Sequence, residues 1–66
     1  MIKVRRYKYK DNSMLYVISS GQPIEVNDTE ELRKFMKDEY KDVGWLDRII
    51  SWTFSGDHKK VYCKVR

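Results

Sequence analysis

The sequence contains a single cysteine and a single histidine among its 66 residues. One cysteine excludes an internal disulfide framework, so the core itself must hold the fold, and a reducing, cytoplasmic setting fits this usage. The longest uninterrupted apolar run, residues 14–18, is far shorter than a membrane span or the core of a signal peptide. We therefore expect a protein that has no membrane partner.

Residue types that support catalysis or metal binding are scarce. His58 stands beside Asp57 in a predicted turn, and Cys63 lies inside a predicted strand, where a free cysteine packs as a small hydrophobe. Zinc needs three or four ligands, but the sequence has no CxxC or HxxxH spacing. The three glycines are too far apart to form a phosphate-binding loop. We therefore expect a protein that is not an enzyme and holds no metal or cofactor.

Apolar residues are nevertheless sufficient for a folded protein. Hydrophobic residues make up 41% of the chain and aromatic residues 14%, which is enough for a thin two-layer core and more than disordered chains carry. A chain of this length buries only about 60% of the surface that its unfolded form exposes, which leaves little room for a deep cavity. The sequence predicts a single small domain that spans residues 1–66.

Charge is distributed unevenly along the chain, whose net charge is +4. Residues 1–24 carry five basic residues and one acidic residue, and residues 49–66 carry four basic residues and one acidic residue. Residues 25–48 are acidic, with eight carboxylates against five basic side chains. If the two ends meet in space, they form one basic surface that attracts phosphates or an acidic protein face. The alternative is that these charges only maintain solubility.

Alternation in residues 2–10 predicts a strand, but the alternation changes phase at Arg5 and Arg6. A β-bulge there would place the apolar and aromatic residues on one face and the basic residues on the other. Without a bulge, Lys3, Arg5, Tyr7 and Tyr9 would share one mixed face. Residues 11–13 have turn chemistry and residues 14–19 read as a second strand, so residues 2–19 predict a hairpin.

A helix is predicted to begin near residue 28. Either Asn27 with Glu30 or Asp28 with Glu31 has the spacing of a capping box. Gly44 offers a left-handed C-terminal cap. The helix presents one apolar stripe, formed by Leu32, Phe35, Met36 and Tyr40.

The remaining residues predict a second hairpin. Residues 45–54 fit either a helical stripe or a strand, and their content of Ile, Trp, Thr and Phe favours the strand. Residues 55–58 form a turn, and residues 59–66 predict a strand in which Val61, Cys63 and Val65 point inward. The expected fold is a small α+β domain of β-β-α-β-β order, with one antiparallel sheet and one helix packed on one face.

The order of features from Glu30 to Val65 resembles the layout of HicA-type mRNA interferase toxins: a helix, Gly-Trp, a strand, a turn with Gly and His, and a strand. The resemblance implies an RNase whose catalytic histidine is His58. Asp57 interrupts the family's Gly-Ser-His turn, and a hairpin replaces its opening helix. An RNase toxin is therefore the third of our functional hypotheses.

The leading hypothesis is a non-enzymatic protein that contacts nucleic acid through a basic and aromatic sheet surface. Basic side chains pair with phosphates, and tyrosine rings can stack on unpaired bases. If the first and last strands adjoin, their residues form one surface. The alternative is that the tyrosines only cover a thin sheet and the lysines protect its edges from aggregation. The predicted binding residues are Lys3, Arg5, Arg6, Tyr7, Lys8, Tyr9, Lys10, Lys60, Tyr62, Lys64 and Arg66.

The second hypothesis is an inhibitor of a nucleic-acid-processing or defence enzyme, comparable to the accessory proteins of bacteriophages. Tyr, Trp and Arg commonly anchor protein interfaces, and the chain has five Tyr, two Trp and five Arg. The partner would be an acidic or nucleic-acid-binding protein, and a homodimer is a further alternative. An exposed apolar patch over residues 45–50 would favour this hypothesis, whereas contiguous basic residues would favour nucleic acid.

Overall fold

The structure is a computed structural model that describes residues 1–9 and 11–66. Lys10, one of the predicted binding residues, lies outside the described residues. The order of elements confirms the predicted β-β-α-β-β arrangement and adds a short 3-10 helix, η1. The elements are β1 (Ile2–Lys8), β2 (Met14–Ser20), α1 (Thr29–Met36), η1 (Gly44–Arg48), β3 (Ile49–Phe54) and β4 (Lys60–Val65).

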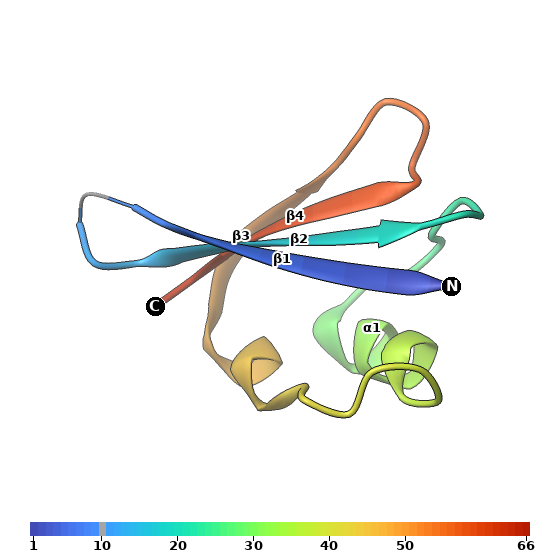
Figure 1. Cartoon of the computed structure of the whole chain (residues 1–66), viewed down its shortest axis with the longest axis horizontal. Helices are drawn as coiled ribbons and strands as arrows, with labels where there is room; N and C mark the ends of the chain where they lie inside the picture. The colour runs from blue at the N-terminus through green and yellow to red at the C-terminus, as the bar shows by residue number, and fades with distance from the viewer. Residues whose placement is uncertain (10) are drawn as a thin grey trace.

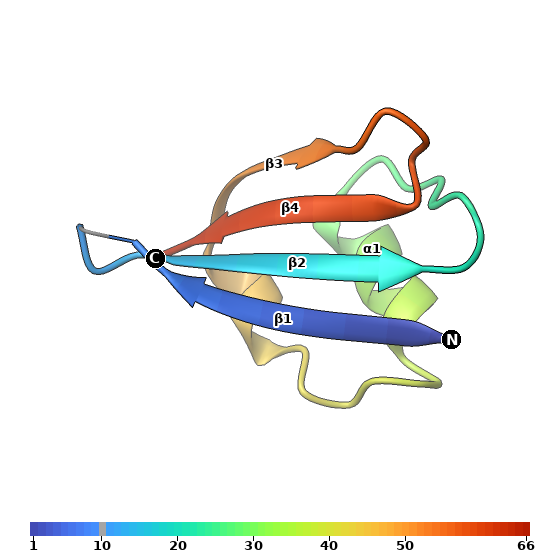
Figure 2. The ribbon, with the colours of Figure 1, turned by 45° about the horizontal axis from the view of Figure 1, so that its top comes forward.

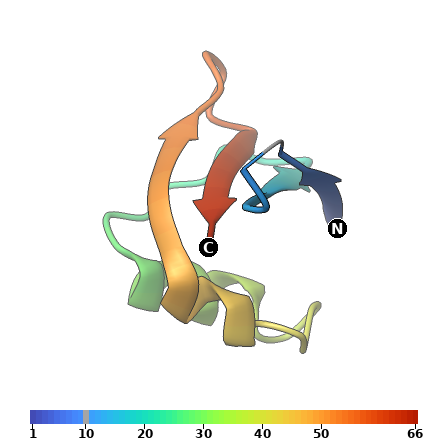
Figure 3. The same cartoon turned by 90° about the vertical axis from the view of Figure 1, so that its left-hand side faces the viewer.

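The four strands form one antiparallel sheet in the order β1-β2-β4-β3. Figures 1 and 3 show α1 and η1 on the same side of this sheet, and Figure 2 shows the strands lying across them. The fold is therefore a small two-layer α+β domain with its helix on one face, as predicted. We call the face that carries α1 and η1 the inner face, and the opposite face the outer face.

Strand β1 pairs with β2 in a continuous register from Ile2 opposite Ser20 to Lys8 opposite Met14. This pairing places no bulge at Arg5 and Arg6. Because successive side chains of a strand point to opposite faces, Lys3, Arg5 and Tyr7 share the outer face, as in the second of the two predicted arrangements. The sheet has its irregularity elsewhere, between Ile49 and Ser51 of β3.

The core lies between the inner face and the two helices. Its residues are at most 8% exposed and come from every element except β1 and β3. Val61, Cys63 and Val65 are buried on β4, which confirms the predicted phase of the last strand. The remaining buried hydrophobic residues are Tyr16, Ile18, Ile24, Leu32, Met36, Trp45 and Leu46.

Helix α1 begins at the second of the two predicted capping boxes. The Asp28 side chain accepts a hydrogen bond from the Glu31 backbone N–H at 2.8 Å, and the Glu31 carboxylate accepts one from the Asn27 N–H at 2.6 Å. The helix is shorter than predicted, because the Met36 carbonyl accepts bonds from the N–H groups of both Glu39 and Tyr40. Carboxylates near a helix C-terminus oppose the helix dipole, which disfavours continuation through residues 38 and 39.

The predicted strand over residues 45–54 was wrong in its first half, because residues 44–48 form η1 and β3 begins at Ile49. A strand would send Trp45 and Leu46 to opposite faces, whereas both side chains are buried in the core at 2% and 1% exposure. The Trp45 indole N–H donates to the Asp42 carbonyl at 2.7 Å. Gly44 therefore starts a helical turn and does not cap α1.

No helix of the described residues has the length and apolar character needed to cross a bilayer.

Candidate functional site

The outer face carries a mixture of basic, aromatic and small side chains. Side chains alternate between the two faces along each strand, and the pairing register shows which residues of the four strands share the outer face. No helix covers this face within residues 1–9 and 11–66, as Figures 1 and 3 show. The outer-face residues of the strands are Lys3, Arg5, Tyr7, Leu15, Val17, Ser19, Ser51, Thr53, Lys60, Tyr62 and Lys64.

These side chains form rows that run across the strands. One row crosses all four strands through Arg5, Val17, Tyr62 and Thr53. The next row is Tyr7, Leu15, Lys64 and Ser51. Each of these two rows therefore combines a cation, an aromatic ring and a small hydroxyl side chain.

The basic residues of β1 and β4 form two stripes. A single surface required the first and last strands to adjoin, but the strand order places β2 between them. Neighbouring strands lie about 4.8 Å apart, so the stripe with Lys3 and Arg5 lies about 10 Å from the stripe with Lys60 and Lys64. Leu15 and Val17, both partly buried, occupy the space between the stripes. The outer face thus has an apolar centre line with cations on both sides.

Lys64 has the most defined surroundings of these cations. Its Nζ lies 3.5 Å from Oδ2 of Asp11 and 5.4 Å from the centre of the Tyr9 ring. The Ser13 hydroxyl donates to Oδ1 of Asp11, and this bond, with the Ser13 N–H and the Lys64 charge, lowers the pKa of the Asp11 carboxyl. Tyr9 is therefore brought to the outer face beside Lys64, as the arrangement without a bulge predicted. An incoming phosphate would have to compete with the Asp11 carboxylate for Lys64.

Three of the predicted binding residues lie away from the outer face. Arg6 is paired with Tyr16 and Lys8 with Met14, which places both on the inner-face side of β1. Both remain exposed. Arg66 follows β4, where its N–H donates to the Arg48 carbonyl at 3.1 Å, and it lines a shallow depression beside the start of β3. Charge alone predicted one group of basic residues, whereas the pairing register divides them.

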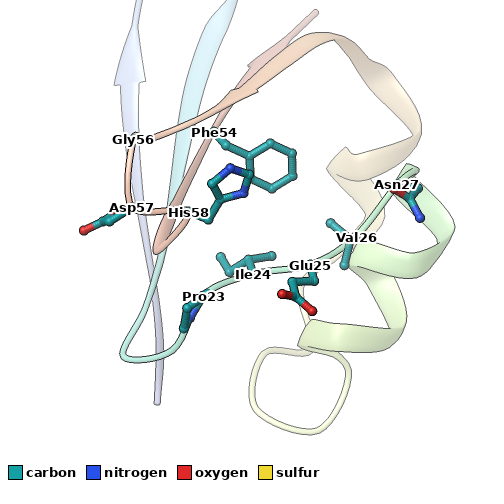
Figure 4. A pocket seen from close by; sticks show the side chains of 9 residues that line it. All are labelled: Pro23, Ile24, Glu25, Val26, Asn27, Phe54, Gly56, Asp57 and His58. Atoms are coloured by element: carbon teal, nitrogen blue, oxygen red, sulfur yellow. The ribbon is translucent and has the colours of Figure 1, made fainter.

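A larger depression of about 540 Å³ lies beside His58, the residue to which the toxin resemblance assigns catalysis (Figure 4). The imidazole stacks on Phe54 with the ring centres 4.9 Å apart, and the backbone at His58 is left-handed, with φ of 59°. Figure 4 shows the Asp57 side chain pointing away from the imidazole. Asp57 accepts bonds from the Lys59 N–H and the Ser55 hydroxyl, which lower the pKa of its carboxyl. The neighbouring carboxylate therefore does not orient the His58 ring.

The sequence did not lead us to those residues of the outer face that are neither basic nor aromatic. Leu15, Val17, Ser51 and Thr53 complete its rows, and Ser51 and Thr53 are exposed. The alternation of residues 14–20 around the buried Tyr16 and Ile18 could have identified Leu15 and Val17. The alternation of Ser51 and Thr53 with the apolar Trp52 and Phe54 could have placed these two residues in the same way, because the irregularity of β3 lies before Ser51.

Comparison with protein-family models, curated proteins and solved structures finds no match for this chain. Across residues 1–9 and 11–66, no group of three or more His, Cys, Asp or Glu side chains is arranged to hold a metal ion.

Proposed function

We propose that this chain is a non-enzymatic nucleic-acid-binding protein whose contact surface is the outer face of the sheet. The observation that carries the proposal is the placement of Tyr62 on the interior strand β4 between Lys60 and Lys64 on the same face. Alternate residues of a strand lie about 6.8 Å apart, so each lysine stands one such step from the ring. A second cationic stripe with Lys3 and Arg5 flanks the other side of the face.

The chemistry of this arrangement suits a single strand. The lysine and arginine side chains pair with phosphates, while tyrosine rings and apolar side chains accept the flat faces of unpaired bases. Tyr7 is 49% exposed and Tyr62 is only partly buried, so both side chains remain open to a ligand on the outer face. Bases in a duplex are stacked on each other and cannot lie on these rings. We therefore infer that the ligand is single-stranded.

An inhibitor of a nucleic-acid-processing enzyme ranks second. The apolar patch that would have favoured a protein partner is buried at Trp45 and Leu46, and Ile50 is its exposed member, at 52%. The basic and aromatic residues are instead spread over an open sheet face. We therefore retain the inhibitor as the function to be tested next if nucleic-acid binding fails.

The neighbouring residues Arg5 and Arg6 offer a matched test, because both are exposed arginines of β1 that lie on opposite faces. Binding of single-stranded oligonucleotides should weaken with salt by a log–log slope of about −0.7 per phosphate contact. Contacts from the four outer-face cations would give a slope near −2.8, and affinity would fall about 50-fold between 50 and 200 mM salt. Arg5→Glu should reduce the slope to about −2.1, whereas Arg6→Glu should leave it close to the wild-type value.

Fluorescence anisotropy over this salt range measures both quantities. Circular dichroism confirms that each variant is folded. Equal effects of Arg5→Glu and Arg6→Glu would show that only net charge matters and would contradict an outer-face site. If the wild type binds neither DNA nor RNA at low salt, the proposal fails and an inhibitory function takes its place.

A further inference from the structure

A shallow depression of about 150 Å³ lies on the outer face, where the β1–β2 hairpin approaches β3 and β4. Its aromatic and apolar lining comes from Tyr9, Leu15 and Tyr62. Its polar lining comes from Ser51 and Thr53 of β3 and from Lys64 of β4. The depression therefore brings ring surfaces, hydroxyl groups and one cation to a single place on the proposed contact face.

The pairing of β3 with β4 holds the polar groups at defined positions. Ser51 lies opposite Lys64, and Thr53 lies opposite Tyr62, so each hydroxyl is one strand spacing from its partner. Both serine and threonine are exposed. A hydroxyl group can donate one hydrogen bond and accept others, so these two side chains can pair with either donors or acceptors on the edge of a ligand ring.

The volume of the depression is that of a single ring. An enclosed cavity of about 150 Å³ accommodates benzene, and this depression offers a similar volume while remaining open to solvent on one side. A pyrimidine base is one such ring with polar edges, whereas a purine has two fused rings. We propose that this depression is a subsite for one unpaired pyrimidine base of a single-stranded nucleic acid. This inference rests on the proposed function, to which it adds a base preference.

The geometry assigns a role to each group. Tyr9 and Tyr62 contact the base through their rings, and Leu15 provides apolar surface. The hydroxyl groups of Ser51 and Thr53 form hydrogen bonds with the polar edge of the base. Because hydroxyl groups can both donate and accept, the subsite suits cytosine as well as uracil or thymine. Lys64, whose Nζ lies 5.4 Å from the Tyr9 ring centre, pairs with the adjoining phosphate in place of Asp11.

The test compares labelled twelve-residue oligonucleotides of dT, dC and dA, and of rU, rC and rA, by anisotropy at about 50 mM salt, within the range where phosphate contacts remain strong. Wild type should bind the pyrimidine oligonucleotides about fivefold more tightly than the purine ones, because only a single ring reaches the hydroxyl groups of the depression, whereas stacking is open to every base. The preference should appear in the DNA and the RNA series alike, because the hydroxyls contact the base and not the sugar. A preference confined to one series would overturn the assignment.

Two substitutions at Thr53 locate the preference. Thr53→Trp fills the depression on a strand that tolerates aromatic residues, and it should bring the pyrimidine-to-purine ratio close to one without changing the salt slope. Thr53→Val keeps the side-chain shape but removes the hydroxyl, so it should lower the ratio while preserving the fold. Thr29→Val, the same substitution at the start of α1 on the other side of the sheet, serves as the control and should leave the ratio unchanged.

The two proposals fail in different ways. Equal affinity of the wild type for all the oligonucleotides, or a preference that survives both Thr53 substitutions, would overturn the pyrimidine subsite while leaving nucleic-acid binding intact. Absence of binding to every oligonucleotide would overturn the proposed function and the subsite with it.

Discussion

Cys63 makes the stability of the fold sensitive to alkaline pH. Its side chain is fully buried at the centre of the inner face, with Tyr16 opposite it on β2 and Trp52 opposite it on β3. Burial disfavours the charged thiolate and raises the pKa of the Cys63 thiol from its usual 9.0 to about 12. The unfolded chain can ionise this thiol at a pH where the folded protein cannot.

The sign and size of the effect follow from this difference in pKa. The folded pKa lies above the unfolded value, so the stabilisation by the neutral thiol is complete below pH 9 and is lost as the pH rises from 9 towards 12. One pKa unit corresponds to about 1.4 kcal/mol, and pH 11 lies two units above the usual pKa of 9.0, so the loss at pH 11 is about 3 kcal/mol. A chain of this length has a total stability of roughly 3 to 10 kcal/mol. The loss is therefore large enough to measure.

Urea denaturation followed by tryptophan fluorescence at pH 8, 10 and 11 tests the prediction, with Cys63→Ala as the control. The variant leaves a small cavity that should cost about 1 kcal/mol at every pH. It also keeps every other ionisable side chain of the wild type. We expect the variant to be less stable than wild type at pH 8 and more stable at pH 11. A stability difference that stays constant from pH 8 to pH 11 would refute the burial of a neutral thiol.

Two further predictions concern His58 and Tyr62. The left-handed backbone at His58 favours asparagine over alanine, so His58→Ala should be about 1 kcal/mol less stable to urea than His58→Asn, although both lose the stacking on Phe54. Equal stabilities of the two variants would contradict a left-handed backbone at this residue. Loss of RNA cleavage in both folded variants would support the toxin hypothesis. Tyr62→Ala should weaken oligonucleotide binding by about 1 to 3 kcal/mol without changing the salt slope, whereas Tyr62→Phe should retain the affinity. A loss of affinity of similar size in Tyr62→Phe would exclude stacking as the main contribution of Tyr62 to binding.

The elements that could be predicted are those whose local pattern has one interpretation. Residues 60–65 alternate small apolar side chains with long polar ones, and the inward phase of Val61, Cys63 and Val65 was confirmed. The start of α1 was narrowed to two capping boxes because only a few residue types satisfy free N–H groups at a helix start. The hydrogen bonds of Asp28 and Glu31 decide between them.

The errors fall where a long-range contact overrides the local pattern. Residues 45–54 have the composition of a strand, but Trp45 stacks on Tyr16 with the ring centres 4.1 Å apart. Trp45 and the adjacent Leu46 are both buried, and a strand would point them to opposite faces. The end of α1 was placed too late because the apolar spacing of Tyr40 continued the helical stripe. Tyr40 instead packs against the core from the turn that follows the helix.

The candidate site divides in the same way between local and long-range information. The sequence by itself determined that the basic residues concentrate near the two ends of the chain, that the strands pair as two hairpins and that β4 has an inward and an outward face. These properties depend on composition and on the two-residue period of a strand. Only the tertiary structure decided which basic residues share a face. The unbroken register of β1 against β2 separates Arg5 from Arg6, and the insertion of β2 between β1 and β4 places an apolar line between the two cationic stripes. Register and strand order arise from contacts between distant segments, and therefore no local pattern contains them.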